Sequence, residues 1–259
     1  MKLINEIFRR NKTLAYAGLL CLIVAILLSI YAFFNTVEVL GLNSMIKPIK
    51  FCLSVWIYQW TMAYLLFYVN NQQKVKWYSY LSVFVMIFEL SVIIVQAFLG
   101  GLSHFNQTDS IGGILYAVMG LFIVWLTTAT LVLTIRFIFQ KSYTIPAPFA
   151  LSIKIGLLLF VIFSFFGGYM SVLNTHNIGG KMGESGLPLL NWSTLYGDLR
   201  VAHFFGIHSL QIIPFIGYFI TEKIQEEGKA KNYIWLVTFI YFVFITALAV
   251  QSLMGIPFI

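Results

Sequence analysis

The chain has 259 residues, of which 60% are hydrophobic, 17% aromatic and only 10% charged, whereas about a quarter of the residues in a soluble domain are charged. This composition excludes an ordinary soluble domain and indicates an integral membrane protein. The formal charge of +7 does not indicate nucleic-acid binding, because the basic residues are scattered between apolar segments and form no patch with interleaved aromatics. Cys21 and Cys52 lie in apolar runs and offer neither a disulfide framework nor zinc-binding spacing.

Apolar runs long enough to cross a bilayer, which takes about 20 residues, recur along the whole chain. They occupy residues 14–34, 47–69, 77–100, 113–139, 149–172, 199–221 and 233–254. We therefore predict an all-α fold, a polytopic membrane helix bundle with seven transmembrane helices, in a single domain covering residues 1–259. The first run is longer than the apolar part of a cleavable signal peptide and is interpreted as the first membrane helix.

Lysine and arginine orient the predicted bundle, because cytoplasmic loops carry the excess of positive charge. With a cytoplasmic N-terminus, most of the 16 basic residues fall on the cytoplasmic side, and the exceptions are Lys47, Lys50, Lys181 and Arg200. The C-terminus is then extracytoplasmic. We expect a multi-pass plasma-membrane protein, in a bacterium an inner-membrane protein, that has the lipid bilayer as its environment. The sequence leaves open whether the protein is an oligomer.

Polar and ionisable residues gather at residues 191–214, where the sixth predicted span begins. Such side chains are costly in hydrocarbon and usually mark a functional site that faces the bundle interior or a water-filled cavity. At about 100° per residue, one arc of this helix about 140° wide contains Arg200, His203, His208, Gln211 and Pro214. This segregation predicts one polar face on the sixth span.

Other predicted spans carry polar residues at comparable depth, counted at 1.5 Å per residue from the outer end. Glu89 and Gln59 lie roughly 16–18 Å deep and His208 and Gln211 roughly 13–18 Å deep, so we expect these four to meet near mid-membrane. A second layer nearer the outside contains Lys47, Lys50, Gln96, Asp198, Arg200, His203 and Gln251. Together the layers predict a polar pocket in the outer half of the bundle, with the long outer loop at 173–198 as its candidate cover.

The deepest residues are the candidate catalytic groups. Glu89 is expected to be a general base, a proton carrier or a metal ligand, against the alternative of a neutral carboxylic acid bonded between helices. His203 and His208 are candidate acid–base groups or ligands of a divalent metal, with Glu89 or His176 as a third ligand. The alternative for each histidine is an interhelical hydrogen bond. A haem is less favoured, because its axial ligands normally come from facing helices.

The shallower residues are the candidate substrate-binding groups, namely Lys47, Lys50, Gln96, Asp198, Arg200 and Gln211. Arg200 with Lys47 or Lys50 is expected to hold an anionic group, while the glutamines orient the substrate. In the alternative interpretation, Asp198 caps the sixth helix and pairs with Arg200. The two lysines then reach to lipid headgroups.

The residues GDLRVAHFFGIHSLQ (197–211) together with NSMIKPIKF (43–51) resemble an uncharacterised family of bacterial polytopic membrane proteins. The resemblance extends over most of the chain and implies no activity. The residues themselves favour a metal-assisted, membrane-embedded enzyme acting on a lipid-like or small anionic substrate. The alternatives are a proton-coupled transporter, channel or small-ligand receptor, a haem or redox subunit, and a purely structural subunit.

Overall fold

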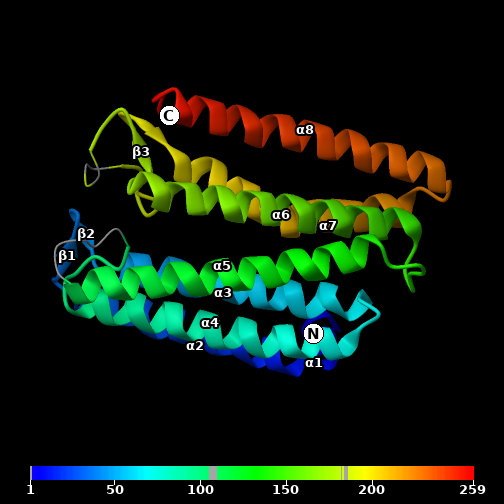
Figure 1. Ribbon diagram of the computed structural model, residues 1–259, viewed down its shortest axis with the longest axis horizontal. Helices are drawn as coiled ribbons and strands as arrows, with labels where there is room; N and C mark the ends of the chain where they lie inside the picture. Colours follow the sequence, from blue (N-terminus) through cyan, green and yellow to red (C-terminus); the bar gives the residue numbers. More distant parts are fainter. Residues whose placement is uncertain (1, 105–109, 182, 184–185) are drawn as a thin grey trace. The chain divides into compact units, whose positions relative to one another are not determined.

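The computed structural model describes residues 2–104, 110–181, 183 and 186–259. These residues form eight α-helices joined by short connections, which confirms the all-α prediction (Figure 1). The helices are α1 (Lys2–Arg10), α2 (Lys12–Ala32), α3 (Ile46–Leu65), α4 (Gln72–Phe98), α5 (Ser110–Ile138), α6 (Ala147–Leu173), α7 (Leu199–Lys223) and α8 (Glu227–Leu253), with a 3-10 turn η1 (Leu66–Tyr68) after α3.

Two short antiparallel ribbons interrupt the helices. One pairs β1 (Glu38–Val39) with β2 (Leu42–Asn43) between α2 and α3. The other pairs β3 (Asn177–Ile178) with β4 (Gly197–Asp198), and it therefore closes the long connection between α6 and α7.

Six of the described helices, α2 and α4 to α8, are long and apolar enough to cross a membrane. They support a polytopic membrane protein whose environment is a lipid bilayer. The seventh predicted span forms a helix as well, α3, but that helix does not reach the same apolar character. Its 20 residues include Lys47, Lys50 and Gln59, and each of these side chains is unfavourable in hydrocarbon. The prediction of seven spans is therefore not confirmed.

The chain divides into two compact units, Met1–Ala129 and Thr130–Ile259, which we call unit 1 and unit 2. In unit 1, α2 packs along α3, and both also contact α4. Its apolar core joins these three helices through Cys21 and Ala25 on α2, Cys52 on α3 and Leu90 on α4. Both cysteines are thus packing residues of the core.

Arg10 of the short helix α1 contacts the C-terminal end of α3. The guanidinium donates to the main-chain carbonyl of Tyr64 at 3.0 Å and lies 3.8 Å from the centre of the Tyr64 ring. It also pairs with Glu6 at 2.7 Å. Carbonyl groups in the last turn of a helix lack intrahelical partners, so Arg10 both satisfies one of them and holds α1 in place.

In unit 2, α6, α7 and α8 run lengthwise beside one another (Figure 1). Small residues let α6 and α7 approach closely, as is common in membrane helix pairs. A Cβ atom added at any of four glycines would come within 3.0 Å of the partner helix, in the pairs Gly156–Pro214, Gly167–His203, Gly206–Phe163 and Gly217–Ser152. The pairing advances in opposite directions along the two helices, so α6 and α7 are antiparallel.

Candidate functional site

Asp198 immediately precedes α7 and caps its N-terminus. Its backbone is extended (φ −124°, ψ 105°) and its carboxylate accepts from the main-chain N–H of Arg200 at 3.0 Å, the geometry of an N-cap. The same carboxylate accepts from the N–H of Ser193 at 2.9 Å. Only 1% of Asp198 is exposed. Asp198 therefore caps α7, as the alternative to a substrate-binding role predicted.

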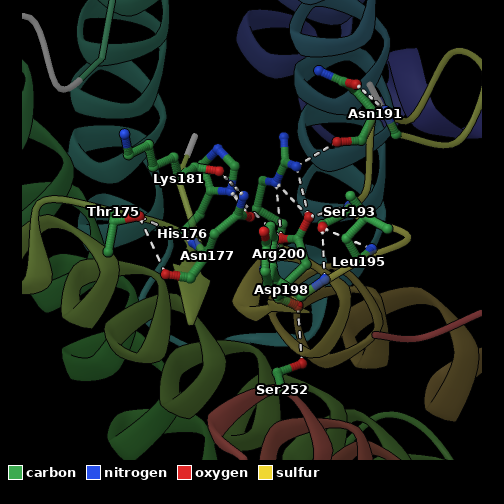
Figure 2. Close-up of polar contacts among 12 residues, drawn as sticks. Thr175, His176, Asn177, Lys181, Asn191, Ser193, Leu195, Asp198, Arg200 and Ser252 are labelled. Carbon is green, nitrogen blue, oxygen red and sulfur yellow. Dashed lines mark hydrogen bonds and ion pairs between the residues drawn. The ribbon is translucent and has the colours of Figure 1, made fainter. Parts of the chain in front are cut away.

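Arg200 binds this buried carboxylate with two nitrogens. Its Nε lies 2.9 Å from Oδ1 of Asp198, and its Nη2 lies 2.6 Å from Oδ2 (Figure 2). Nη2 also donates to the main-chain carbonyl of Asn191. The side chain of Arg200 stays 29% exposed, and its Nη1 has no partner among the described residues. One edge of the guanidinium is thus left for a further acceptor.

The electrostatics of Asp198 follow from these contacts. Burial alone would raise the pKa of its carboxyl, but the hydrogen bond and charge of Arg200, then the Ser193 N–H and His176, outweigh burial. The pKa of Asp198 consequently lies below its ordinary value. The carboxylate is charged at neutral pH.

His176 lies beside Asp198 through the second ribbon. Its main-chain carbonyl accepts from the N–H of Leu199 at 2.9 Å, and its Nδ1 lies 2.7 Å from Oδ1 of Asn177 and 3.7 Å from Asp198. Ser252 of α8 donates to the carbonyl of Asp198 at 2.9 Å. We call the whole group the Asp198 cluster; it consists of His176, Asn177, Ser193, Asp198, Arg200 and Ser252 (Figure 2).

His203 lies one turn further along α7, against α6. Its Nδ1 is 2.7 Å from the main-chain carbonyl of Phe163, and since a carbonyl only accepts, Nδ1 carries the proton. The ring occupies the space that a side chain at Gly167 would fill, with the added Cβ only 2.4 Å from the imidazole. The interhelical hydrogen bond, which was the alternative to a metal or acid–base role for His203, is present. It leaves Nε2 unprotonated, with a lone pair.

His208 is oriented in a similar way within α7. Its Nδ1 lies 3.2 Å from Oε1 of Gln211, and its ring packs edge-to-face on Phe204 with centroids 4.4 Å apart. With Oε1 as the acceptor, Nδ1 again holds the proton and Nε2 the lone pair. Neither His203 nor His208 has a partner at Nε2 among the described residues.

The remaining predicted site residues belong to unit 1. Glu89 on α4 is 4% exposed and Gln59 on α3 is fully buried. One oxygen of Glu89, Oε1, and the amide nitrogen of Gln59 have no hydrogen-bond partner in the described part of the chain. Buried polar atoms are almost always paired, so these two require an explanation.

Lys47, Lys50 and Gln96 are half-buried in unit 1. Lys47 Nζ lies 6.0 Å from the centre of the Phe51 ring. Burial, and secondly the charge of Lys47, hold the pKa of His104 well below its ordinary value. Lys47 therefore faces a neutral imidazole and aromatic surface.

The predicted metal ligands are divided among these places. Glu89 belongs to unit 1, His176 to the Asp198 cluster, and His203 and His208 to the first half of α7. Across residues 2–104, 110–181, 183 and 186–259, no three histidine, cysteine, aspartate or glutamate side chains gather as a metal site. Any metal held by His203 or His208 would draw further ligands from outside this set.

Sequence reasoning did not identify the partners of these residues. Asn177, Ser193 and Ser252 hold Asp198 and its neighbours, and Ser82 donates to Gln59 at 3.3 Å. Ser82 precedes Glu89 by seven residues, the same spacing that relates Glu89 to Gln96. That repeat was a signal available in the sequence.

Comparison of the chain with family models, curated proteins and solved structures found no match.

Proposed function

We propose that the protein is a membrane-embedded enzyme whose reactive groups are the Nε2 atoms of His203 and His208. The observation that carries the proposal is the orientation of both imidazoles: each Nδ1 faces an internal oxygen acceptor, which leaves Nε2 as an unpartnered lone pair among the described residues. Such a lone pair binds a metal ion or accepts a proton from a substrate.

The proposed chemistry is metal-assisted. The Nδ1 bond of His203 to the Phe163 carbonyl is the outer bond that metal-binding histidines usually make, because it fixes the tautomer and the ring orientation. Catalytic zinc takes three protein ligands and leaves one position for water or substrate. His203 and His208 supply two nitrogens.

The proposed substrate is small and anionic or lipid-like. Support comes from Arg200, whose Nη1 is unpartnered among the described residues and whose side chain is partly exposed. Arg200 precedes His203 by three residues, roughly 4.5 Å along the helix axis. A guanidinium edge of this kind suits a carboxylate or phosphate oxygen.

The proposal places this site in the extracytoplasmic half of a single-domain, seven-span plasma-membrane protein with its N-terminus in the cytoplasm. The excess of lysine and arginine in the predicted cytoplasmic segments supports this orientation. In it, α3 crosses the bilayer and keeps Lys47 and Lys50 near the outer headgroups.

A second candidate function is proton-coupled binding or transport of a small ligand. The observation that favours it is the unpartnered, buried oxygen of Glu89. Intramembrane carboxyl groups are typical of proton relays in transporters.

Elemental analysis and an absorption spectrum of detergent-purified protein test the metal-assisted enzyme. We expect a stoichiometric divalent metal in the wild type and its loss in His203→Ala and His208→Ala. His104→Ala is the matched control, because His104 lies outside the spans. Metal-free, colourless wild-type protein would contradict the metal-assisted form, and a haem band would contradict the choice of metal.

A further inference from the structure

One face of α4 carries polar side chains along most of the helix. At about 100° per residue, Tyr78, Glu89 and Gln96 all lie within about 40° of Ser82, and we call these four residues the α4 stripe. The stripe spans about 27 Å of helix length. Tyr78 and Ser82 are 0% exposed and Glu89 is 4% exposed. A row of buried and half-buried polar groups this long is costly inside a membrane helix and is typical of a functional feature.

The two stripe residues that precede Glu89 are hydrogen-bonded to polar groups of α3. The hydroxyl of Tyr78 bonds to that of Tyr58, and Ser82 Oγ donates to Gln59 Oε1 at 3.3 Å. Tyr78 and Ser82 lie at successive turns of α4. Hydroxyl groups both donate and accept, so each of these pairs is able to pass on a proton that water molecules carry between them.

Beyond Ser82, two buried donors and one buried acceptor have no hydrogen-bond partner among the described residues. The side-chain nitrogens of Gln59 and Trp56 are donors without an acceptor, and Oε1 of Glu89 is an acceptor without a donor, in the part of the chain that the structure describes. Glu89 lies about 10.5 Å beyond Ser82 along α4. Water molecules that accept from Gln59 and Trp56 and donate to Glu89 would satisfy all three groups, as buried water commonly does.

We propose that the interface of α3 and α4 in unit 1 is a proton pathway that runs along the α4 stripe and passes through Glu89. Each hydroxyl or water on the pathway takes up a proton on its oxygen and releases its own proton to the next oxygen. The carboxylate of Glu89 becomes a carboxylic acid on loading and returns to a carboxylate on release. One proton is displaced, and no bond between heavy atoms forms or breaks. This inference deepens the second candidate function and stands without the first.

Glu89 is the one residue with a carboxyl side chain in α2, α3, α4 and α5. The elements packed against this part of α4 are α2, α3 and the first half of α5, and their titratable side chains include Cys21, Cys52, Tyr58 and Tyr116, together with Lys47 and Lys50 at the start of α3. Thiols and phenols are neutral at physiological pH. Lys47 and His104 lie against Phe51. As the carboxyl group of these helices, Glu89 is the acid on which the pathway depends.

Proton flux into liposomes tests the proposal. Purified protein is reconstituted into liposomes that contain a pH-sensitive dye, and valinomycin with a potassium gradient imposes the potential. Wild-type protein should acidify the lumen faster than protein-free liposomes, and Glu89→Gln should reduce the rate to that of protein-free liposomes. Ser82→Ala should slow the flux several-fold. Ser91→Ala is the matched control, because Ser91 is exposed on the opposite side of α4, about 180° from Ser82.

Two results would overturn the pathway: wild-type flux no greater than that of protein-free liposomes, or equal flux in wild type and Glu89→Gln. Infrared spectroscopy gives a second readout that does not depend on how well a variant folds. The C=O band of a protonated carboxyl in the wild type should shift on transfer to D₂O, because the pathway connects Glu89 to solvent. A protonated carboxyl band that never shifts would also refute the proposal. Loss of zinc binding in His203→Ala bears only on the enzyme proposal, so the two can fail separately.

Discussion

Arg200 and Asp198 form a bidentate ion pair at the N-terminus of α7, with Nε 2.9 Å from Oδ1 and Nη2 2.6 Å from Oδ2. The carboxylate in this pair is also the cap of the helix. The guanidinium in turn holds the carbonyl of Asn191. The pair therefore joins the long connection between α6 and α7 to the first turn of α7, just before the imidazoles of the proposed site.

Replacing Arg200 should destabilise this end of α7. Arg200→Ala leaves a buried carboxylate without its cation, and we expect a loss of about 3 kcal/mol in the free energy of unfolding. Arg200→Lys keeps the charge but loses the fork geometry, for a loss of about 1–2 kcal/mol. Thermal unfolding in detergent, followed by circular dichroism, measures both. Unfolding temperatures equal to that of the wild type would contradict the importance of the pair.

Acid should weaken the same region. The pKa of Asp198 in the folded protein lies below its ordinary value, so the stabilisation it supplies is present above the unfolded pKa, about 4. That stabilisation is lost as the pH falls through the lower, folded pKa. We expect the unfolding temperature of wild type to fall more steeply below about pH 4 than that of Asp198→Asn. Asparagine keeps a capping oxygen without the charge, so parallel pH curves would exclude this source of acid sensitivity.

Adjacent glycines on α6 provide a test of how His203 is seated. Alanine at Gly167 would place Cβ 2.4 Å from the imidazole, whereas a Cβ at Gly168 meets no atom within 4 Å. Gly167→Ala should cost about 1–3 kcal/mol through overpacking and should displace the imidazole from Phe163. Gly168→Ala should leave stability unchanged or slightly raised. Equal stability of the two variants would show that the ring does not lie against Gly167.

Arg10 and Arg9, which are neighbours in α1 of unit 1, allow a similar comparison of two substitutions. Arg10 has a side chain only 9% exposed and lies over the Tyr64 ring, whereas Arg9 is 62% exposed and pairs with Glu6. Arg10→Lys should lower the free energy of unfolding by about 1 kcal/mol, because the stacked guanidinium and its bond to the Tyr64 carbonyl are lost. Arg9→Lys should have no measurable effect, as exposed ion pairs contribute little. An identical effect of the two substitutions would indicate that α1 is not fastened through Arg10.

The helical architecture could be predicted from hydropathy, because long apolar runs leave few alternatives to membrane helices. The number of spans could not, since α3 mixes aromatic residues with Lys47, Lys50 and Gln59. The pairing of Asp198 with Arg200 was foreseeable as a capping pattern. The bond of His203 to a main-chain carbonyl was not, because backbone acceptors leave no trace in a side-chain pattern.

The α4 stripe shows a different limit of sequence reading. Glu89 and Gln96 are seven residues apart and share a face of α4, and Ser82 extends the same spacing in the other direction. Serine and tyrosine barely lower the hydropathy of a long helix, so their alignment on one face is easily overlooked. The contacts of Tyr78 with Tyr58 and of Ser82 with Gln59 show that the stripe faces polar residues of α3.

The central claim is that His203 and His208 present unpartnered Nε2 lone pairs to a metal ion. Isothermal titration of metal-free, detergent-purified protein with zinc tests it most directly. We predict stoichiometric binding to the wild type and to His104→Ala, and loss of that binding in His203→Ala and in His208→Ala. Zinc binding that survives in the double variant His203→Ala/His208→Ala, or no binding to the wild type, would contradict the claim.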